Sequence, residues 1–295
     1  MTGRLRARSV TANGLQFGLL EAGSGPLALC LHGFPDSAHT WRHLLPALAD
    51  AGYRAVAPFM RGYAPTDVPA DGCFQLGALV ADAAGLHDVL GGDERAVLIG
   101  NDWGAETAYG AGAFAPDRWR RVVTLAVPPL ALDTKIFSDY DQLKRFFYLF
   151  FLKTPFAEPV LAAADDMAFL DRLWQDWSPG YDAGEDLDNV KQCLRDERNL
   201  AAAIGYYRSE EPGSTPPLRI TPTRLNRRRW PALRRSRPCT SYRSRDGCID
   251  LALVKDAERH LAPGSRMEVL EDAGHVLQVE KPAAVNARIL AWVGA

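Results

Sequence analysis

Long apolar runs are absent from this sequence of 295 residues. No stretch approaches the roughly 18 consecutive apolar residues of a membrane-spanning helix, so we expect no membrane span. The N-terminal residues include arginines but lack the apolar core of about 7–15 residues that a secretory signal peptide requires. Together these two absences favour a cytoplasmic protein.

Cysteine is scarce, and neither sign of charge dominates. The net charge of -2 gives no reason to expect a nucleic acid or an anionic membrane as a partner. The cysteines are odd in number and show no CxxC spacing, which is typical of reduced thiols in the cytoplasm. They are Cys30, Cys73, Cys193, Cys239 and Cys248.

Metal-ligand motifs are also missing. His39 and His43 are four residues apart and could face one ion, but no third ligand or HExxH context accompanies them. We therefore interpret both as surface or packing residues, and we expect neither a metal nor a cofactor.

The residues that are present indicate an α/β protein. Apolar residues make up 47% and charged residues 24%, and the length suits one domain that carries a substantial insertion. Strand-like apolar runs alternate with helical patterns, a succession typical of a mostly parallel, doubly wound sheet. The strand-like runs cover residues 15–23, 27–31, 53–60, 96–100, 121–129 and 266–274, and the helical patterns cover residues 39–52, 77–92, 105–116 and 282–293.

The alternation is interrupted in the middle of the chain. Residues 130–208 contain long helical patterns rich in aromatic residues, such as YDQLKRFFYLFF, and no convincing strand. We interpret this part as a helical cap inserted into the sheet domain. The predicted organisation is a first part of the core at residues 1–128, the cap at residues 129–213 and a second part of the core at residues 214–295.

The stretch GNDWG, residues 100–104, follows one of the apolar runs and precedes a helical pattern. Its Gly-x-Asp-x-Gly spacing is that of a nucleophile elbow, where small residues make room for a side chain on a strained strand-to-helix turn. The helix N-terminus favours the ionised form of Asp102. An ionised carboxylate can attack an sp3 carbon without a general base and form an ester, so we interpret Asp102 as a nucleophile.

Breaking such an ester requires a base, an acid partner and oxyanion donors. His275 follows a strand-like run near the C-terminus, where the histidine falls in the chain order nucleophile, acid, histidine. The loop HGFPD, residues 32–36, and the residue after the nucleophile nominate the backbone amides of Phe34 and Trp103 as oxyanion donors. The segment SRDGCID offers Asp246 and Asp250 as the acid, and we favour Asp246, which stands in an Asp-Gly turn.

The segments HGFPD, RGYAPTD, GNDWGA and AGHVLQVEKP together resemble the α/β-hydrolase superfamily, and specifically its epoxide hydrolase branch, over almost the whole chain. The resemblance implies an α/β-hydrolase fold with a cap. It also implies attack by Asp102 on an oxirane carbon, followed by hydrolysis of the ester by water that the His275–Asp246 pair activates. The product is then a vicinal diol.

Members of this branch use two cap tyrosines as acids for the departing oxygen, because an alkoxide is a poor leaving group. Tyr148, in FFYLFF, and Tyr207, in GYYRS, match those positions in this sequence. Tyr206 replaces Tyr207 if the register differs by one residue. The aromatic cap favours a small lipophilic substrate, with water as the second reactant.

Two alternatives remain open. Haloalkane dehalogenases share the aspartate and the tryptophan, but their loop resembles His-Gly-Asn-Pro, and the side chain of Phe34 cannot donate a hydrogen bond to a halide. Fluoroacetate dehalogenases carry arginine after the aspartate, where this chain has Trp103. The second alternative is a non-catalytic protein that binds a ligand under the cap. Monomer and homodimer are both compatible with the sequence.

Residues 219–245 hold ten arginines and no acidic residue. This segment could be a basic loop that binds a nucleic acid or a protein, or simply a solvated loop. Relatives of the resembling branch carry an apolar strand of the type Pro-Thr-Leu-Tyr-Leu before the acid, where this chain has RPCTSYRSR. Because a central strand of arginines would bury unpaired charge, we expect the segment to loop out or to form a poor strand.

A third interpretation of this segment is a compensated local frameshift. Permitted codons for residues 237–241, read one base earlier behind a C, spell Pro-Thr-Leu-Tyr-Leu. We expect resequencing of the gene to find this apolar strand in the neighbouring frame. Nucleotides that spell no apolar strand in that frame would contradict the hypothesis.

Overall fold

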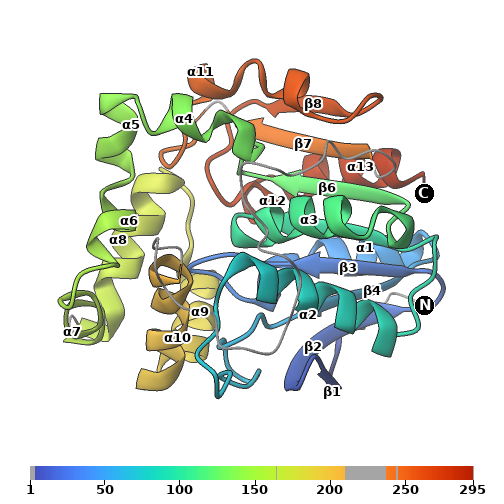
Figure 1. Cartoon of the computed structure of the whole chain (residues 1–295), viewed down its shortest axis with the longest axis horizontal. Coiled ribbons are helices and arrows are strands. Elements are labelled where there is room, and N and C mark those ends of the chain that lie inside the picture. The colour runs from blue at the N-terminus through green and yellow to red at the C-terminus, as the bar shows by residue number, and fades with distance from the viewer. Residues whose placement is uncertain (1–3, 164, 210–236, 244, 295) are drawn as a thin grey trace.

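The structure is a computed structural model of the chain, and it describes residues 4–163, 165–209, 237–243 and 245–294. Within these residues, eight strands form one sheet in the order β1-β2-β4-β3-β5-β6-β7-β8 (Figure 1). The strands are β1 Arg6–Ala12, β2 Leu15–Gly23, β3 Leu27–Leu31, β4 Arg54–Pro58, β5 Val97–Asn101, β6 Arg121–Leu125, β7 Arg237–Arg243 and β8 Arg266–Leu270.

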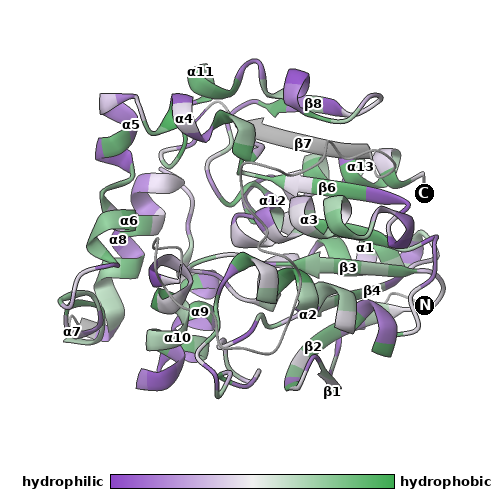
Figure 2. Cartoon of the chain, in the orientation of Figure 1, coloured by the Kyte–Doolittle hydropathy of each residue, from purple (hydrophilic) through white to green (hydrophobic). Residues whose placement is uncertain are grey.

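Strands β3 to β8 are joined by parallel pairings, while β2 runs antiparallel to both β1 and β4. All five residues of β3 and all five of β5 are buried, as expected for parallel strands covered on both faces. Figure 2 shows hydrophobic residues along β3. The predicted mostly parallel α/β sheet is therefore confirmed.

Helices cover both faces of this sheet (Figure 1). On one face α1 contacts α13, and on the other α2 contacts α3, which packs on β5 and β6. These helices are α1 Leu44–Asp50, α2 Leu76–Val89, α3 Trp103–Phe114 and α13 Pro282–Val293, and the short helices α11 Leu251–Val254 and α12 Leu277–Glu280 lie in the C-terminal part of the chain. None of the described helices is both long enough and apolar enough to cross a bilayer.

Strand β1 is an element that the sequence patterns did not predict. Its residues are mostly exposed because it is the edge strand of the sheet, so apolar alternation is missing. It forms a hairpin with β2 through Asn13 and Gly14, which both have positive φ, 46° and 79°. An Asn-Gly pair between two strands is a strong hairpin signal, so this dipeptide could have revealed β1.

The expectation for the segment before the acid is corrected in part. Residues Arg237–Arg243 form β7, which pairs in parallel with β6 on one side and β8 on the other. These residues therefore do not loop out of the sheet. Their backbone N–H and C=O groups are satisfied by pairing with the strands on both sides, which favours a strand. The rest of the arginine-rich segment, residues 219–236 and 244, lies outside the described residues. The structure therefore does not test the frameshift hypothesis.

The helices between β6 and β7 lie beyond the carboxyl ends of the parallel strands (Figure 1). They are α4 Asp133–Ile136, α5 Tyr140–Arg145, α6 Phe147–Phe151, α7 Ala157–Ala163, α8 Ala168–Trp177, α9 Gly184–Leu194 and α10 Glu197–Arg208. Within α8 the buried residues stand at helical spacing, so this helix turns one apolar face inward; they are Leu170, Leu173, Trp174 and Trp177.

Hydrogen bonds to backbone carbonyls fasten these helices to the loops of the sheet. The indole of Trp174 donates to the carbonyl of Pro35 at 2.9 Å. From α10, Asn199 donates to the carbonyl of Gly62 at 2.7 Å. Both hydrogen bonds are buried, where an unmade hydrogen bond is costly, so they fix how the helices sit over the sheet.

His32 joins the ends of β3 and β4. Its Nδ1 lies 2.9 Å from the carbonyl of Gly33, and its Nε2 accepts from the N–H of Met60 at 2.9 Å. Both contacts are satisfied by the neutral ring with the proton on Nδ1. Burial lowers the pKa of His32 from its ordinary 6.5 to about 4, so the folded state holds this ring uncharged.

This pKa predicts an acid-sensitive contribution to stability. Because the unfolded chain protonates His32 more readily, the contribution is present above pH 6.5 and is lost as the pH falls towards 4. We expect the difference in unfolding free energy between the wild type and His32→Gln to shrink by about 2–3 kcal/mol between pH 7 and about pH 4.5. Urea unfolding at both pH values measures it. The exposed His260, changed to Gln, is the control, and an equal difference at both pH values would contradict the prediction.

Candidate active site

Asp102 lies on the sharp turn between β5 and α3. Its φ of 52° and ψ of -120° are strained for a residue with a side chain. The turn is held by the N–H groups of Ala105 and Glu106, which donate to the Asp102 carbonyl at 2.8 and 3.0 Å. The helix therefore begins directly behind the carboxylate.

Neighbouring backbone leaves no room for larger residues at the two elbow glycines. A Cβ on Gly100 would lie 2.0 Å from the carbonyl oxygen of Gly104, and a Cβ on Gly104 would lie 2.1 Å from the carbonyl oxygen of Leu31. Both distances are far below contact distance. The Gly-x-Asp-x-Gly spacing thus has a steric cause: the turn packs directly against the end of β3.

The loop after β3 brings a backbone donor to this carboxylate. The N–H of Phe34 donates to Oδ1 of Asp102 at 2.8 Å in a buried position. Trp103 is the first residue of α3, so its N–H belongs to the helix N-terminus, where amides lack an acceptor within the helix. Of the two amides nominated from the sequence, that of Phe34 thus contacts the Asp102 carboxylate and that of Trp103 stands at the start of the helix directly after it. The positive end of the helix dipole favours the negative charge of Asp102.

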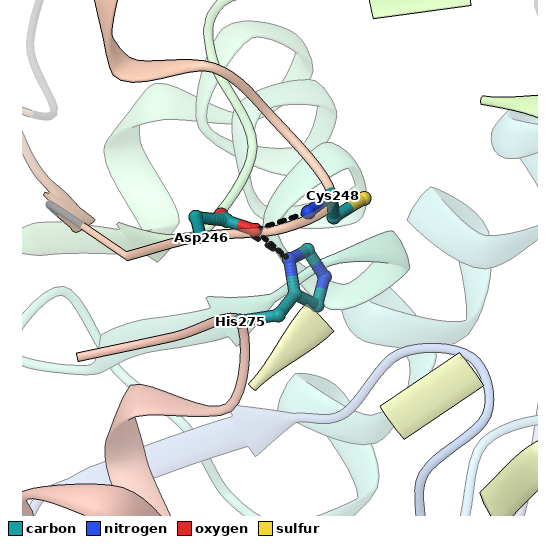
Figure 3. Close-up of side chains that lie close together, drawn as sticks. All are labelled: Asp246, Cys248 and His275. Carbon is teal, nitrogen blue, oxygen red and sulfur yellow. Dashed lines mark hydrogen bonds and ion pairs between the residues drawn. The ribbon is translucent and has the colours of Figure 1, made fainter. Parts of the chain in front are cut away.

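His275 lies between two carboxylates, those of Asp102 and Asp246. Its Nε2 is 3.6 Å from Oδ2 of Asp102, and its Nδ1 is 3.3 and 3.4 Å from the two oxygens of Asp246 (Figure 3). The backbone N–H groups of Cys248 and Ile249 donate to Oδ1 of Asp246 at 2.7 and 3.2 Å, which fixes the direction of that carboxylate. The fold thus places an imidazole between two carboxylates, with one ring nitrogen towards each.

The other candidate acid, Asp250, has a different environment. Its carboxylate accepts from the N–H of Ala252 at 2.8 Å and so caps α11. It also pairs with Arg145 at 3.3 Å. Of the two aspartates considered from the sequence, the structure therefore places Asp246 against His275 and Asp250 at a helix start.

Two residues that the sequence analysis missed hold the histidine loop. The backbone carbonyl of Trp177, at the end of α8, accepts from the N–H of His275 at 3.0 Å and from the N–H of Gly247 at 3.1 Å. The carboxylate of Glu280 accepts from the N–H of Gly274 at 2.8 Å. Glu280 lies in the AGHVLQVEKP segment and could have been singled out there, whereas a carbonyl contact leaves no signal in the sequence.

Tyr148 and Tyr207 line the cavity above Asp102. The cavity has a volume of about 100 Å³, and Trp103 and Cys248 also border it. The two phenol rings meet edge to face with their centroids 6.0 Å apart. The rest of the lining contains the acidic residues Glu106 and Asp133 and is otherwise apolar, with Val127, Pro128, Ile136, Phe137, Phe146, Leu149 and Ile249.

Burial keeps both of these phenols protonated. It raises the pKa of Tyr148 and of Tyr207 well above the usual value of 10, and the negative charge of Asp102 raises each of them further. The neighbouring Tyr206 faces away, because its hydroxyl donates to the carbonyl of Arg61 at 2.8 Å. Of the two adjacent tyrosines, Tyr207 therefore is the one at the cavity.

Within the part of the chain that the structure describes, the group of three possible ligands that lie close together includes neither His39 nor His43. The ring of His39 packs edge to face on Phe59, with centroids 5.6 Å apart. Among the described residues, the ligand atoms that gather within 4.8 Å of one another are those of Asp246, Cys248 and His275. This group coincides with the acid and histidine of the candidate active site.

A family model described as alpha/beta hydrolase fold matches residues 26–282. Over 297 residues the chain is 27% identical to the AB hydrolase superfamily protein YfhM of Bacillus subtilis, and the match covers 98% of both chains. It is 38% identical over 168 residues to an epoxide hydrolase of Caballeronia sordidicola, covering 56% of this chain and 51% of that protein. The match to this epoxide hydrolase therefore spans about half of its length.

Among solved structures, the chain is similar to epoxide hydrolase A of Mycobacterium thermoresistibile. The two superpose with a TM-score of 0.76, they are 27% identical, and the superposition covers 98% of each chain. An epoxide hydrolase of Vigna radiata superposes with a TM-score of 0.79 at 23% identity. At that identity the second likeness supports the fold alone.

Proposed function

The chain belongs to the α/β-hydrolase fold family, and we propose that it is an epoxide hydrolase that opens a lipophilic epoxide to a vicinal diol through an ester on Asp102. One observation carries the proposal: a carboxylate on the elbow faces a cavity into which two buried, protonated tyrosines also project. A serine hydrolase has no need of two acids opposite its nucleophile, whereas the opening of an epoxide requires an acid for the departing oxygen.

In the first step the Asp102 carboxylate attacks one carbon of the oxirane. Oδ1 is engaged by the Phe34 N–H at 2.8 Å, so Oδ2 is the attacking oxygen. A bond forms between Oδ2 and the carbon, and the bond from that carbon to the epoxide oxygen breaks. Tyr148 or Tyr207 gives its phenol proton to the departing oxygen, which stays bonded to the neighbouring carbon, so that the ester intermediate carries a hydroxyl group in place of a strongly basic alkoxide.

In the second step water hydrolyses the ester. His275 accepts a proton from a water molecule on Nε2, which faces Asp102, and the hydroxide attacks Cγ of Asp102. The negative charge that develops on Oδ1 is stabilised by the amides of Phe34 and Trp103. Asp246 stabilises the protonated imidazole. The bond from Cγ to Oδ2 then breaks, and Oδ2 leaves as a hydroxyl of the diol with the proton of the hydroxide that attacked Cγ. The proton on His275 returns through solvent to the tyrosinate, which restores the Asp102 carboxylate, the imidazole and the phenol.

The apolar lining supports a lipophilic substrate. Val127, Ile136 and Leu149 border the same cavity as the reacting groups, so a hydrocarbon substituent on the epoxide would be removed from water there. The halide alternative has less support, because the side chain of Phe34 offers no donor for a leaving halide. A panel of epoxides and haloalkanes separates the two activities by the product, diol or halide ion.

We expect the two halves of the mechanism to separate in variants. Asp102→Ala should lower epoxide turnover by at least about 10³-fold. His275→Gln should still form the ester but not hydrolyse it, so that intact-mass spectrometry finds the protein heavier by one substrate. Asp250→Asn is the matched control, because this nearby carboxylate caps a helix and pairs with Arg145. Turnover that survives Asp102→Ala would overturn the mechanism.

We expect the two cavity tyrosines to act in ester formation. Tyr148→Phe and Tyr207→Phe should each slow that step by about 10²–10³-fold. Tyr206→Phe is the control, because its hydroxyl bonds to a backbone carbonyl and its loss should cost about 1 kcal/mol of stability but little rate. Both cavity phenols have a pKa above 10, so their ionisation should not lower the rate of ester formation up to pH 10. Stopped-flow measurement of ester formation tests this, and equal rates in all three variants would contradict the assignment.

A further inference from the structure

Cys248 is a buried thiol in the candidate active site for which the proposed reaction has no use. It lies two residues after Asp246 and lines the cavity above Asp102. Its Sγ is 3.4 Å from the hydroxyl of Tyr148. Figure 3 shows Cys248 beside the Asp246 carboxylate and the ring of His275. A thiol, an imidazole and a carboxylate thus share one pocket.

These three side chains form the donor set of a soft divalent cation. Zn²⁺ takes sulfur, nitrogen and oxygen ligands in tetrahedral sites, with bonds of about 2.0–2.3 Å. Two ligands held at about 2.0–2.1 Å from one ion in this geometry lie about 3.3–3.4 Å apart, and Nδ1 of His275 is 3.3 Å from Oδ1 of Asp246. The Cys248 sulfur belongs to the same group, whose ligand atoms all lie within 4.8 Å of one another.

We infer that Asp246, Cys248 and His275 form a binding site for a thiophilic divalent cation, Zn²⁺ or Cd²⁺, and that occupation of this site stops catalysis. The ion takes one lone pair each from the sulfur, Nδ1 and a carboxylate oxygen. The thiol proton and the proton between His275 and Asp246 pass to water. The hydrogen bond that orients the imidazole is then replaced by two bonds to the metal.

The surroundings of the site favour soft over hard cations. Cys248 and His275 are each only 1% exposed, and Asp246 is 8% exposed. Of the three, Cys248 borders the cavity above Asp102, and an ion that binds at so buried a site must give up most of its water. Mg²⁺ keeps its waters and prefers oxygen ligands, so it gains little from a site with one carboxylate. Cd²⁺ and Zn²⁺ gain a bond to sulfur.

Binding is tested directly on the metal-free protein after treatment with a chelator. We expect titration with Cd²⁺ to produce a sulfur-to-metal charge-transfer absorption in the wild type. Cys248→Ser should lose this absorption and bind Cd²⁺ at least about tenfold more weakly by calorimetry. Cys73→Ser is the matched control, because Cys73 is a half-buried thiol in a different loop, and it should retain wild-type binding. Mg²⁺ should give no binding.

A second arm needs no variant. Bound Zn²⁺ should protect Cys248 of the wild-type protein from alkylation by iodoacetamide, measured peptide by peptide, while Mg²⁺ should not.

A third arm measures turnover and compares each protein with its own metal-free rate. Zn²⁺ should inhibit the wild type and Cys73→Ser at least about tenfold more strongly than Cys248→Ser.

The inference is overturned if Cys248→Ser binds Cd²⁺ as tightly as the wild type, or if Zn²⁺ leaves the alkylation of Cys248 unchanged. The absorption, calorimetry and alkylation measurements do not depend on the reaction that the protein catalyses. A failure of the proposed epoxide hydrolysis would therefore leave them able to decide whether the metal site exists.

Discussion

The close approach of the turn after β5 to the end of β3 is the constraint on which the site depends. Gly104 packs so tightly on the carbonyl of Leu31 that no side chain fits between them. This approach brings the Phe34 amide to within 2.8 Å of the Asp102 carboxylate. The positive φ of Asp102 costs about 1–3 kcal/mol, and the buried parallel strands on either side keep the turn from relaxing.

The remaining groups of the site depend on the helices between β6 and β7 as well as on the sheet. The acid and the histidine stand on loops that follow β7 and β8, and the carbonyl of Trp177 at the end of α8 holds both loops at once. The Trp177 ring also packs on His275, with ring centroids 4.8 Å apart. The helices between β6 and β7 therefore do more than border the cavity, because a displaced α8 would release the histidine loop as well.

The groups that the sequence predicted are those whose signals are local. The elbow around Asp102 and the loop around Phe34 each follow a buried apolar strand, so spacing alone locates them. Contacts made by backbone atoms, such as the Trp177 carbonyl, have no sequence signal. The choice between Tyr206 and Tyr207 required the structure. Both are tyrosines, and adjacent residues of a helix point about 100° apart, so only the orientation of the helix shows which of them faces the cavity.

Helix boundaries between β6 and β7 also could not be predicted from the sequence. The segment YDQLKRFFYLFF has the pattern of one long helix, but the chain breaks into α5 and α6 at Phe146, whose φ and ψ of -85° and 11° depart from helical values. Phe146 is buried against Phe137 and Tyr148. The helix break at Phe146 follows from this packing with residues on both sides of it in the chain. The spacing of apolar residues within the segment carries no information on such packing.

Burial also links the two steps of the proposed reaction through charge. The phenols of Tyr148 and Tyr207 are hard to ionise chiefly because they are buried. The charge of nearby Asp102 is a second contribution to both, although for Tyr148 it is smaller than those of Cys248 and Tyr207. When Asp102 becomes a neutral ester, that second contribution disappears, so the phenols become stronger acids as negative charge develops on the departing oxygen. One negative charge thus moves across the cavity while the total charge stays constant. A water-poor site can accommodate such a transfer, because burying a second charge would cost much free energy, whereas moving the charge that is already buried costs little.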